Sequence, residues 1–375
     1  MMQAARARVL WVLPRLVVGG VERVSLQLAH GLADRGMVCA FALRRDDGAL
    51  VQETAQRFEV HRLGSGSIVE FVPALARLLR AWRPTHVVTA FGDVALLSLV
   101  ALRLSEVDAV LVHGVHNVHL PAGVARNPWA RLRQHLYGLL AAPVYARADA
   151  VVAVSAGIEQ EIRTLYRRQP RRLVLIHNPV VDASGLATDA QAVREPAPVA
   201  RMVAMGRLEP EKGFDLLVDA LARLDRSLSW SMDIWGDGGQ REALRRRIRA
   251  HGLEQRVHLR GVAERPMHVL QGYGLLVMAS RCEGFGNVLV EAMAAGLQVV
   301  AVDCPYGPRE ILLDGRIGVL VARHDLVRAM ARMLRGESLA DAAALRRRAA
   351  DFTVQRSVEA WAALLDEAVA ARRSA

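Results

Sequence analysis

The sequence predicts an α/β protein with two Rossmann-like domains, each built on a parallel sheet. Short apolar runs bounded by turn residues alternate with amphipathic segments of helix length along most of the chain. This alternation is interrupted over 178–198, where Asp, Ser, Gly and Pro accumulate. A chain of 375 residues with 52% apolar residues can bury two cores, so the interruption is interpreted as a linker between domains.

The first domain is expected over 1–180. Residues 8–13 form a buried strand, a glycine-bearing loop follows, and 21–35 form an amphipathic helix that ends at Gly36. Residues 37–43 supply the next strand, which completes a strand–loop–helix–strand unit typical of a parallel sheet. Further apolar runs predict strands at 86–90, 109–113, 150–154 and 172–176.

The second domain is expected over 195–352, where the alternation resumes. Strands are predicted at 199–205, 231–235, 257–260, 275–279, 298–302 and 318–321. Helices are predicted at 213–224, 239–250 and 264–271, with another between Asn287 and Gly296. In open parallel sheets, ligands bind beyond the carboxyl ends of the strands, so the loops that follow these strands are where functional residues are sought.

The charge of the chain is positive and unevenly distributed. Its net charge is +11, and residues 1–180 hold 22 arginines against 13 acidic residues, a net charge of +9. A basic half-molecule indicates an anionic partner, such as membrane lipid or a charged substrate, although an arginine-rich soluble surface would look the same. Aromatic residues make up only 5% and no nucleic-acid motif occurs, so no nucleic-acid partner is expected.

The cysteines and the apolar segments indicate a cytoplasmic protein. Three cysteines, an odd number lying far apart, are typical of a reducing compartment and give no disulfide framework. No apolar stretch approaches the roughly 18 residues that a membrane helix needs. The apolar run near the N-terminus is interrupted by Pro14 and Arg15, which favours a strand over a signal peptide.

The most informative segment is 280–310. It places Glu283 and Glu291 eight positions apart, on either side of a Gly-Phe-Gly-Asn turn. Asn287 is the expected N-cap of the helix that follows and Gly296 its C′ glycine, so the two carboxylates flank a helix N-terminus. The free N–H groups there, from about Gly286 to Leu289, suit a phosphate, and the carboxylates suit hydroxyls on either side of it.

A nucleoside diphosphate sugar has that layout of hydroxyls, pyrophosphate and ribose. The alternative is a surface helix with two solvated glutamates, which does not explain why acidic residues bracket two glycines and an aromatic residue.

Arg207 and Lys212 are predicted to bind the pyrophosphate. The chain has 48 arginines and a single lysine, and that lysine lies in a Gly-Arg-Leu-Glu-Pro-Glu-Lys-Gly motif after a predicted strand. Fixed cations near a departing diphosphate stabilise the charge that grows there as the glycosidic bond breaks. No Asp-x-Asp occurs, which argues against a transferase that uses a divalent metal for this task, so no metal cofactor is expected. For Arg207, a surface salt bridge is the alternative.

Two features of the first domain are also candidates. Gly19 and Gly20 follow the first strand, where a backbone without Cβ atoms can approach a phosphate, although a plain tight turn looks the same. His113, His116 and His119 are crowded into one loop. Their spacing of three invites a zinc interpretation, but the preceding strand and a glycine favour a loop, and structural histidines are the alternative.

The run Glu-Gly-Phe-Gly-Asn-Val-Leu-Val-Glu resembles the Glu, seven residues, Glu signature of the retaining glycosyltransferases of family four. This resemblance, which runs through nearly the whole chain, implies the GT-B architecture, in which two Rossmann-like domains face one cleft. The first domain would bind the acceptor and the second the nucleotide-sugar donor. The final helix, about 353–375, would pack back on the first domain.

The resemblance also assigns roles to residues. Glu291 would bind the ribose hydroxyls, and Glu283 the donor sugar near the reacting carbon. The backbone of Phe285 and Gly286 would reach the sugar, that of Val288 and Leu289 the phosphate, and the region of Arg260 and Val262 the base, for which uracil is expected. The donor-binding set that follows is Gly19, Gly20, Arg207, Lys212, Arg260, Val262, Glu283, Phe285, Gly286, Asn287, Val288, Leu289 and Glu291.

The first domain carries two further matches. The Gly-Gly-x-Glu start is completed by Glu22, and His116 with Asn117 matches a His-Asn pair that lies at the donor sugar. Glu283, His116, Arg207 and Lys212 are therefore the expected catalytic residues. Retention in this family is ascribed to attack from the face of departure, with the leaving phosphate as base.

Donor and acceptor are less closely specified. The loop Asp303–Glu310 resembles that of bacterial enzymes that use UDP-N-acetylhexosamine or UDP-galactose. The basic first domain and the segment 128–137 suggest docking on the anionic inner face of a membrane, with a glycan or lipid-linked acceptor such as lipopolysaccharide or capsule. The alternatives are a UDP-sugar epimerase of the same fold and a non-catalytic nucleotide-sugar-binding subunit.

Overall fold

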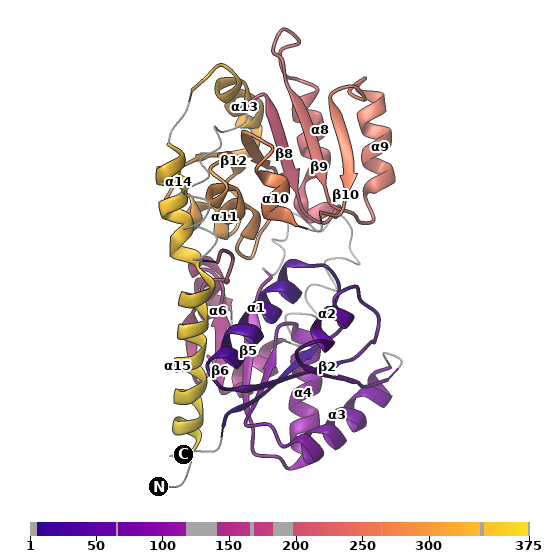
Figure 1. Cartoon of the computed structure of the whole chain (residues 1–375), viewed down its shortest axis with the longest axis vertical. Coiled ribbons are helices and arrows are strands. Elements are labelled where there is room, and N and C mark those ends of the chain that lie inside the picture. The colour runs from indigo at the N-terminus through magenta and orange to yellow at the C-terminus, as the bar shows by residue number, and fades with distance from the viewer. Residues whose placement is uncertain are drawn as a thin grey trace. The chain divides into compact units, whose positions relative to one another are not determined.

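The computed structural model confirms an α/β protein with two parallel sheets. The chain divides into two compact units: unit 1 comprises residues 1–179 and 354–375, and unit 2 comprises 180–353. Figure 1 traces both units. The structure describes residues 6–64, 67–117, 141–165, 169–182, 198–263, 265–337 and 341–373. The linker predicted over 178–198 lies mostly outside the described residues, and a cleft between the domains stays a prediction.

Unit 1 contains a parallel sheet whose described strands follow the order β3-β2-β1-β4-β5-β6-β7. The strands are β1 (Arg8–Leu13), β2 (Val38–Leu43), β3 (Glu59–Arg62), β4 (His86–Thr89), β5 (Val110–Val115), β6 (Ala150–Ala153) and β7 (Leu173–Leu175). The order reverses beside β1, because β2 and β3 extend the sheet in one direction and β4 to β7 in the other. Such a reversal leaves the carboxyl ends of the central strands open to a ligand.

Helices cover both faces of this sheet. They are α1 (Gly20–Asp34), α2 (Val51–Ala55), α3 (Ile68–Trp82), α4 (Gly92–Ser105), α6 (Ala156–Leu165) and α15 (Val354–Arg373). The long C-terminal helix α15 packs beside α1 (Figure 1) and adds Trp361 to the core, where its ring contacts Trp11. Helices α3 and α4 pack against each other.

Unit 2 contains a second parallel sheet, with the order β10-β9-β8-β11-β12-β13. The strands are β8 (Arg201–Met205), β9 (Ser231–Trp235), β10 (Val257–Gly261), β11 (Leu275–Met278), β12 (Gln298–Val302) and β13 (Val319–Val321). The helices are α8 (Phe214–Leu221), α9 (Arg241–Ala250), α10 (Pro266–Leu270), α11 (Asn287–Ala294), α12 (Gly307–Ile311), α13 (Leu326–Leu334) and α14 (Ala342–Ala349), with short 3-10 turns at Pro210–Lys212, Arg323–Asp325 and Ala350–Phe352. The reversal beside β8 brings β8 and β11 side by side.

Two elements depart from the sequence prediction. Strand β3 was not predicted, because Glu59–Arg62 has only one apolar residue and lies at the edge of the sheet, where polar side chains remain in water. The segment after Asp303 was predicted as a loop throughout, but Gly307–Ile311 forms the short helix α12, with Pro308 in its first turn. In the described part of the chain, no helix is long and apolar enough to cross a bilayer.

Candidate functional site

The candidate site of unit 2 lies where the neighbouring strands β8 and β11 end. The loop after β8 carries Arg207 and closes in the 3-10 turn that holds Lys212, and the loop after β11 carries Ser280 and Glu283. Because carboxyl ends of adjacent parallel strands meet at one edge, residues about 70 positions apart in sequence come into contact.

Lys212 and Glu283 form the centre of this site. The ammonium Nζ of Lys212 donates to both carboxylate oxygens of Glu283 at 2.7 Å, and the Ser280 hydroxyl donates to Glu283 Oε1 at 2.6 Å. The Glu283 side chain is 8% exposed and that of Lys212 is 23% exposed, so both charges are largely withdrawn from water. This excludes the alternative in which Glu283 is a solvated surface glutamate.

The backbone fixes both partners. Gly213, which follows Lys212, has φ of +65°, and a Cβ there would lie 2.0 Å from the carbonyl oxygen of Ala279. The position therefore requires glycine, both for its left-handed conformation and for its contact with the end of β11. On the other side, Glu283 N–H donates to Pro305 O and Tyr306 N–H donates to Glu283 O, both at 2.6 Å.

The two loops are also tied together by an arginine. Arg281 donates to both carboxylate oxygens of Asp215 at 2.8 and 2.7 Å, and its N–H donates to the Glu211 carbonyl. Burial opposes the charge of Asp215, but the hydrogen bonds and charge of Arg281 outweigh it and keep the Asp215 pKa below its usual value. The loop that carries Glu283 is thus joined to the first turn of α8 by a bidentate ion pair, and to the loop that carries Lys212 by the Arg281 N–H.

Helix α11 differs from the prediction at its first residues. Its N-cap is Gly286, with φ of +104° and ψ of +53°, and Asn287 is its first helical residue, so the prediction that Asn287 is the N-cap was wrong by one position. A glycine fits because the left-handed region is strained for a residue with a Cβ. The prediction counted Leu289 among the free donors, but its N–H donates to Gly286 O at 2.9 Å. Gly286, Asn287 and Val288 begin the helix on the side of the site.

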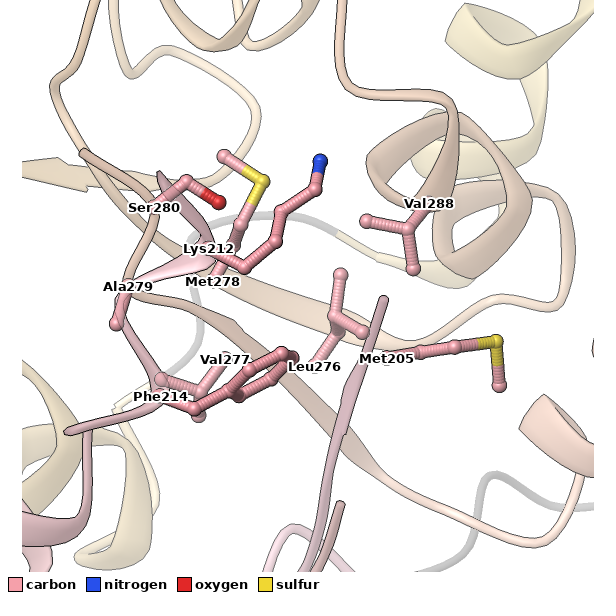
Figure 2. Close-up of a pocket in the computed structure, with 9 residues that line it drawn as sticks. All are labelled: Met205, Lys212, Phe214, Leu276, Val277, Met278, Ala279, Ser280 and Val288. Carbon is pink, nitrogen blue, oxygen red and sulfur yellow. The ribbon is translucent and has the colours of Figure 1, made fainter. Parts of the chain in front are cut away.

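A small pocket, partly open to solvent, lies between Lys212 and the start of α11. In Figure 2 the Lys212 ammonium lies on the same side of the pocket as Ser280 and Val288, whereas Phe214 lies on the opposite side. The pocket is lined by Met205, Lys212, Phe214, Leu276, Val277, Met278, Ala279, Ser280 and Val288. A cation and a helix N-terminus that border one pocket are the combination that binds a phosphate.

Phe285 connects the site to the place where the chain passes between the units. Its buried ring meets that of Phe352 edge to face, with 5.3 Å between the ring centroids. The carbonyl of Phe352 accepts N–H groups of Val180 and Val181, next to the two points where the chain changes unit. A Cβ on Gly307 would lie 1.5 Å from Phe285 O, so α12 packs directly on the backbone of Phe285.

Two predicted residues, Arg207 and Arg260, form ion pairs with other partners. Arg207 is 61% exposed and pairs with Glu211 at 2.9 Å, which is the surface salt bridge considered as its alternative. Arg260 Nε donates to Asp233 Oδ1 at 2.9 Å, and the same carboxylate accepts the Tyr273 hydroxyl at 2.7 Å. The hydrogen bond to Asp233 raises the Arg260 pKa, so the Arg260 guanidinium is bound to a carboxylate of strand β9. Val262 is exposed just beyond β10, and Glu291 is half-buried within α11.

A glycine row at the same edge was missed in the sequence. Gly206, Gly236 and Gly261 end the adjacent strands β8, β9 and β10, and all three have positive φ. The Gly206 oxygen lies 1.8 Å from where a Cβ of Gly236 would be, and Gly236 N–H donates to Gly261 O at 2.6 Å. The result is a shelf without side chains beside Lys212. The signal was present, because each of these predicted strands is followed or ended by a glycine.

In unit 1, the predicted glycines begin helix α1. Gly19 is its N-cap and Gly20 its first residue. The buried Glu22 side chain folds back on Gly19, since a Cβ there would lie 2.3 Å from Glu22 Oε2. The glycine pair therefore makes room for a carboxylate of its own helix, which places a negative charge at the helix N-terminus.

The described histidines of the predicted cluster lie at the end of β5. His113 is buried and shares a hydrogen bond with Thr89 Oγ1 at 3.0 Å, which fits its structural interpretation. Burial and, to a smaller extent, the neighbouring His113 lower the His116 pKa to about 4, against an opposing hydrogen bond with Asn178. His116 is thus neutral at neutral pH, and its Nδ1 has no hydrogen-bond partner in the part of the chain that is described. His119 and the segment 128–137 lie outside the described residues.

Family models and solved structures show which known proteins the chain is similar to. Residues 188–351 match the family model described as Glycosyl transferases group 1, and residues 18–183 match the one described as Glycosyltransferase Family 4. A crystal structure of Anabaena Alr3699/HepE in complex with UDP-glucose superposes with a TM-score of 0.78 at 20% identity, covering 96% of this chain and 99% of that one. The fold is that of the GT-B glycosyltransferases.

Two curated relatives of this GT-B chain are similar over shorter stretches. The GtfA subunit of the UDP-N-acetylglucosamine–peptide N-acetylglucosaminyltransferase of Streptococcus gordonii is 36% identical over 34% of this chain and 25% of its own length. The lipopolysaccharide core biosynthesis glycosyltransferase LpsE of Rhizobium meliloti is 30% identical over 47% of this chain and 50% of its own length. The chain thus spans between a quarter and a half of these relatives.

Proposed function

We propose that the chain is a retaining, metal-independent glycosyltransferase of family four. It would move a hexose or N-acetylhexosamine from a UDP-sugar to a glycan or lipid-linked acceptor of cell-surface polysaccharide synthesis. The observation that carries this proposal is the contact of Glu283 with Lys212 and Ser280, at a pocket that the start of α11 also lines. That arrangement supplies a cation, a helix N-terminus and a hydroxyl-binding carboxylate within one site.

Lys212 would bind the diphosphate, with Val288 and Asn287 at the helix N-terminus. When the bond between the anomeric carbon and the phosphate oxygen breaks, its electron pair remains on that oxygen, and the ammonium of Lys212 stabilises the new charge. The acceptor oxygen bonds to the anomeric carbon from the same face. Its proton passes to the departing phosphate oxygen, so the products are UDP and the glycosylated acceptor. A fixed lysine in this position takes over the charge stabilisation that a metal supplies elsewhere.

Glu283 would bind hydroxyls of the donor sugar while it holds Lys212. Its two oxygens already accept hydrogen bonds from Lys212 and Ser280, so the carboxylate is fixed before a ligand arrives. A fixed carboxylate needs no reorganisation during the reaction. Phe285 and Gly286 would present their backbone to the sugar, and Glu291 would bind ribose hydroxyls. The glycine shelf and the nearby Val262 would leave room for the uracil ring.

His116 would approach the donor sugar from unit 1 as a neutral imidazole. Its lowered pKa means that it donates or accepts a hydrogen bond without bringing a positive charge to an oxocarbenium-like centre. Gly19 and Gly20 would lie near the phosphates from the same unit. Arg207, which is exposed and paired with Glu211, would leave that carboxylate when the diphosphate binds.

The names of the relatives support the donor and the process. One relative uses UDP-N-acetylglucosamine, another acts in lipopolysaccharide core synthesis, and a structural neighbour was crystallised with UDP-glucose. We extend these to a UDP-sugar and a surface glycan for this chain, at the cytoplasmic face of an anionic membrane and without nucleic acid. The three cysteines are free and buried, as suits a reducing compartment.

The test is a panel of UDP-, GDP- and ADP-sugars, with thermal stabilisation and release of free nucleotide as readouts. We expect UDP-sugars to stabilise the protein and to release UDP slowly, and Glu283→Ala to lose that release by about 100-fold or more. Glu242→Ala, which removes an exposed carboxylate of unit 2, is the matched control and should behave as wild type. Stabilisation by none of the panel would overturn the proposed phosphate site.

The same assay separates the alternatives. An epimerase would convert one UDP-sugar to another without releasing UDP, which nuclear magnetic resonance of the reaction mixture would detect. A non-catalytic binding subunit would be stabilised by UDP-sugars and would produce neither UDP nor a new sugar.

A further inference from the structure

Helices α3 and α4 of unit 1 expose aliphatic side chains that a globular surface normally covers. Ile68, Val69, Val100 and Leu104 are between 44% and 81% exposed. They make up half of the eight large hydrophobic residues that are recorded as exposed in the described part of the chain. Apolar surface concentrated on one pair of helices marks an interaction site more often than isolated apolar residues do.

The sequence of α4 explains why its outer side remains apolar. The run GDVALLSLVALRLS has leucine or valine on every side of the helix, so no rotation of the helix can bury all of them against the sheet. Val94, Ala95 and Ala101 fill the core side, which leaves Val100 and Leu104 outside. A helix that is apolar all round is typical of an element with partners on more than one side.

Arginines lie among these aliphatic residues. Arg77, Arg80 and Arg83 come from α3 and its C-terminal cap, Arg103 comes from α4, and all four are exposed. Arg80 donates to the Leu104 carbonyl, which joins the last turns of the two helices. No carboxylate lies within ion-pair distance of any of the four among the described residues, whereas Arg15, Arg44 and Arg57 of the same unit are paired with acidic residues.

We propose that this surface docks on an anionic lipid bilayer. The α3–α4 face comprises Ile68, Val69, Arg77, Arg80, Arg83, Val100, Arg103 and Leu104. Aliphatic side chains can enter the boundary between headgroups and acyl chains, and arginines can lay their stems along it while their guanidinium groups meet lipid phosphates. The net charge of +9 over residues 1–180 adds a general attraction to a negative membrane.

The composition favours lipid over a protein partner. Exposed arginines beside exposed aliphatic residues are the combination that suits the phosphates and acyl chains of an anionic lipid surface. Val100 and Leu104 lie on the side of α4 away from the buried Val94, Ala95 and Ala101, and Ile68 and Val69 are exposed in the first turn of α3. Docking would bring unit 1 to the membrane that holds the proposed lipid-linked acceptor, and in that respect the inference rests on the proposed function. Docking itself does not need the donor site.

The test is co-sedimentation of the full chain at low salt with vesicles of phosphatidylcholine, with and without phosphatidylglycerol. Wild type is expected to bind only the anionic vesicles, and high salt should weaken the binding. At about 1 kcal/mol per arginine, Arg77→Gln with Arg103→Gln is expected to weaken partition roughly thirtyfold. Val100→Ser with Leu104→Ser should weaken it without changing the net charge, and since both positions are exposed, the fold should be kept.

Two controls match these variants elsewhere on unit 1. Arg45→Gln with Arg62→Gln removes the same charge from exposed strand ends, and Leu175→Ser removes an exposed aliphatic residue from β7. Both should retain binding within about threefold. Thermal stabilisation by UDP, measured in parallel, reports on unit 2, so a failed donor proposal can be told apart from a failed docking proposal.

Three results would overturn the docking proposal. One is no binding of wild type to anionic vesicles at low salt. Another is an equal loss in the control and face variants, which would show attraction by diffuse charge alone. The last is a dimer in the absence of vesicles that Val100→Ser with Leu104→Ser dissociates, which would make the face an interface between two copies of the chain.

Discussion

The carboxyl edges of the two sheets hold buried polar side chains in different charge states. In unit 2, charges are kept and paired, since Lys212 is held by Glu283 and Asp215 is held by Arg281. In unit 1, the buried His113 and the partly buried His116 are kept neutral, because desolvation lowers the pKa of each to about 4. The sheet of unit 2 therefore ends at a fixed ion pair, whereas the sheet of unit 1 holds two neutral histidines at the end of β5.

This difference teaches which unit is prepared for a charged ligand. A buried ion pair loses much of its hydration energy and often gives no net stability, so its retention needs another reason. In the proposed function, binding and release of a diphosphate would supply such a reason for Lys212 and Glu283. A neutral histidine, by contrast, offers hydrogen bonds and avoids repulsion of a cationic sugar centre. Acid, a backbone substitution and a core substitution each test this contrast between the two units.

Acid should separate the two units most strongly. His113 and His116 have a pKa near 4 in the folded state and about 6.5 when unfolded, so below pH 6.5 the unfolded chain binds more protons. Their contribution to the free energy of unfolding of unit 1 is fully present above about pH 6.5 and is lost as pH falls towards 4. From pH 7 to pH 5, unit 1 should lose up to about 2 kcal/mol for each histidine.

Unfolding monitored at several pH values, with probes in each unit, measures this loss. His113→Gln should remove the contribution of one histidine from the acid dependence of unit 1, to which His30 and His86 also contribute because their pKa values are lowered by burial. His324→Gln, an 83% exposed control in unit 2, should leave both units unchanged. An equal acid dependence of both units would contradict the contrast between neutral and paired edges.

Gly213→Ala tests whether backbone contact positions Lys212. An alanine there must adopt φ of +65°, and its Cβ would lie 2.0 Å from Ala279 O. We therefore expect unit 2 to lose about 2–4 kcal/mol of its free energy of unfolding, with weaker UDP binding. Gly252→Ala is a close control, because it has φ of +64° and no atom within 4 Å of the added Cβ. It should cost about 1–2 kcal/mol and leave UDP binding intact. Similar effects of the two substitutions would show that the contact with β11 is unimportant.

Phe352→Leu tests the contact that supports the donor loop. It removes the edge-to-face pair with Phe285 and the position of Arg348 over the Phe352 ring, which together should cost about 1–2 kcal/mol. Because Phe285 precedes Gly286, UDP-sugar affinity should fall by about threefold to tenfold, given up to 1.4 kcal/mol of lost positioning. Phe71→Leu, the same change in the core of unit 1, should cost stability without lowering that affinity. If both lowered it equally, the Phe285 contact would have no special role.

Periodicity predicted most of the fold. Strands predicted at 231–235 and 298–302 occur at those residues, because each is an apolar run bounded by turn residues. Strand β3 was missed because Glu59–Arg62 is polar, and its pairing with β2 is a long-range contact that composition does not show. The left-handed glycine at Gly286 moved the start of α11 by one residue from the predicted cap.

The candidate site was predictable as a set of residues but not as a set of contacts. Lys212 and Glu283 were each identified from a local motif, yet their hydrogen bonds depend on β8 and β11 being neighbours. Arg207, grouped with Lys212 by sequence, instead pairs with Glu211 on the surface. The link from Phe285 to Phe352 joins residues 67 positions apart and leaves no pattern in either local segment.

The central claim, that Lys212 binds the diphosphate, can be tested directly because the chain has one lysine. Reductive methylation with ¹³C-formaldehyde keeps its charge and gives one side-chain resonance, with the N-terminal amine as an internal reference. We predict that UDP and UDP-sugars shift the Lys212 resonance in a saturable way, while uridine, which lacks phosphate, does not. A resonance that stays in place while UDP binds and stabilises the protein would contradict the claim.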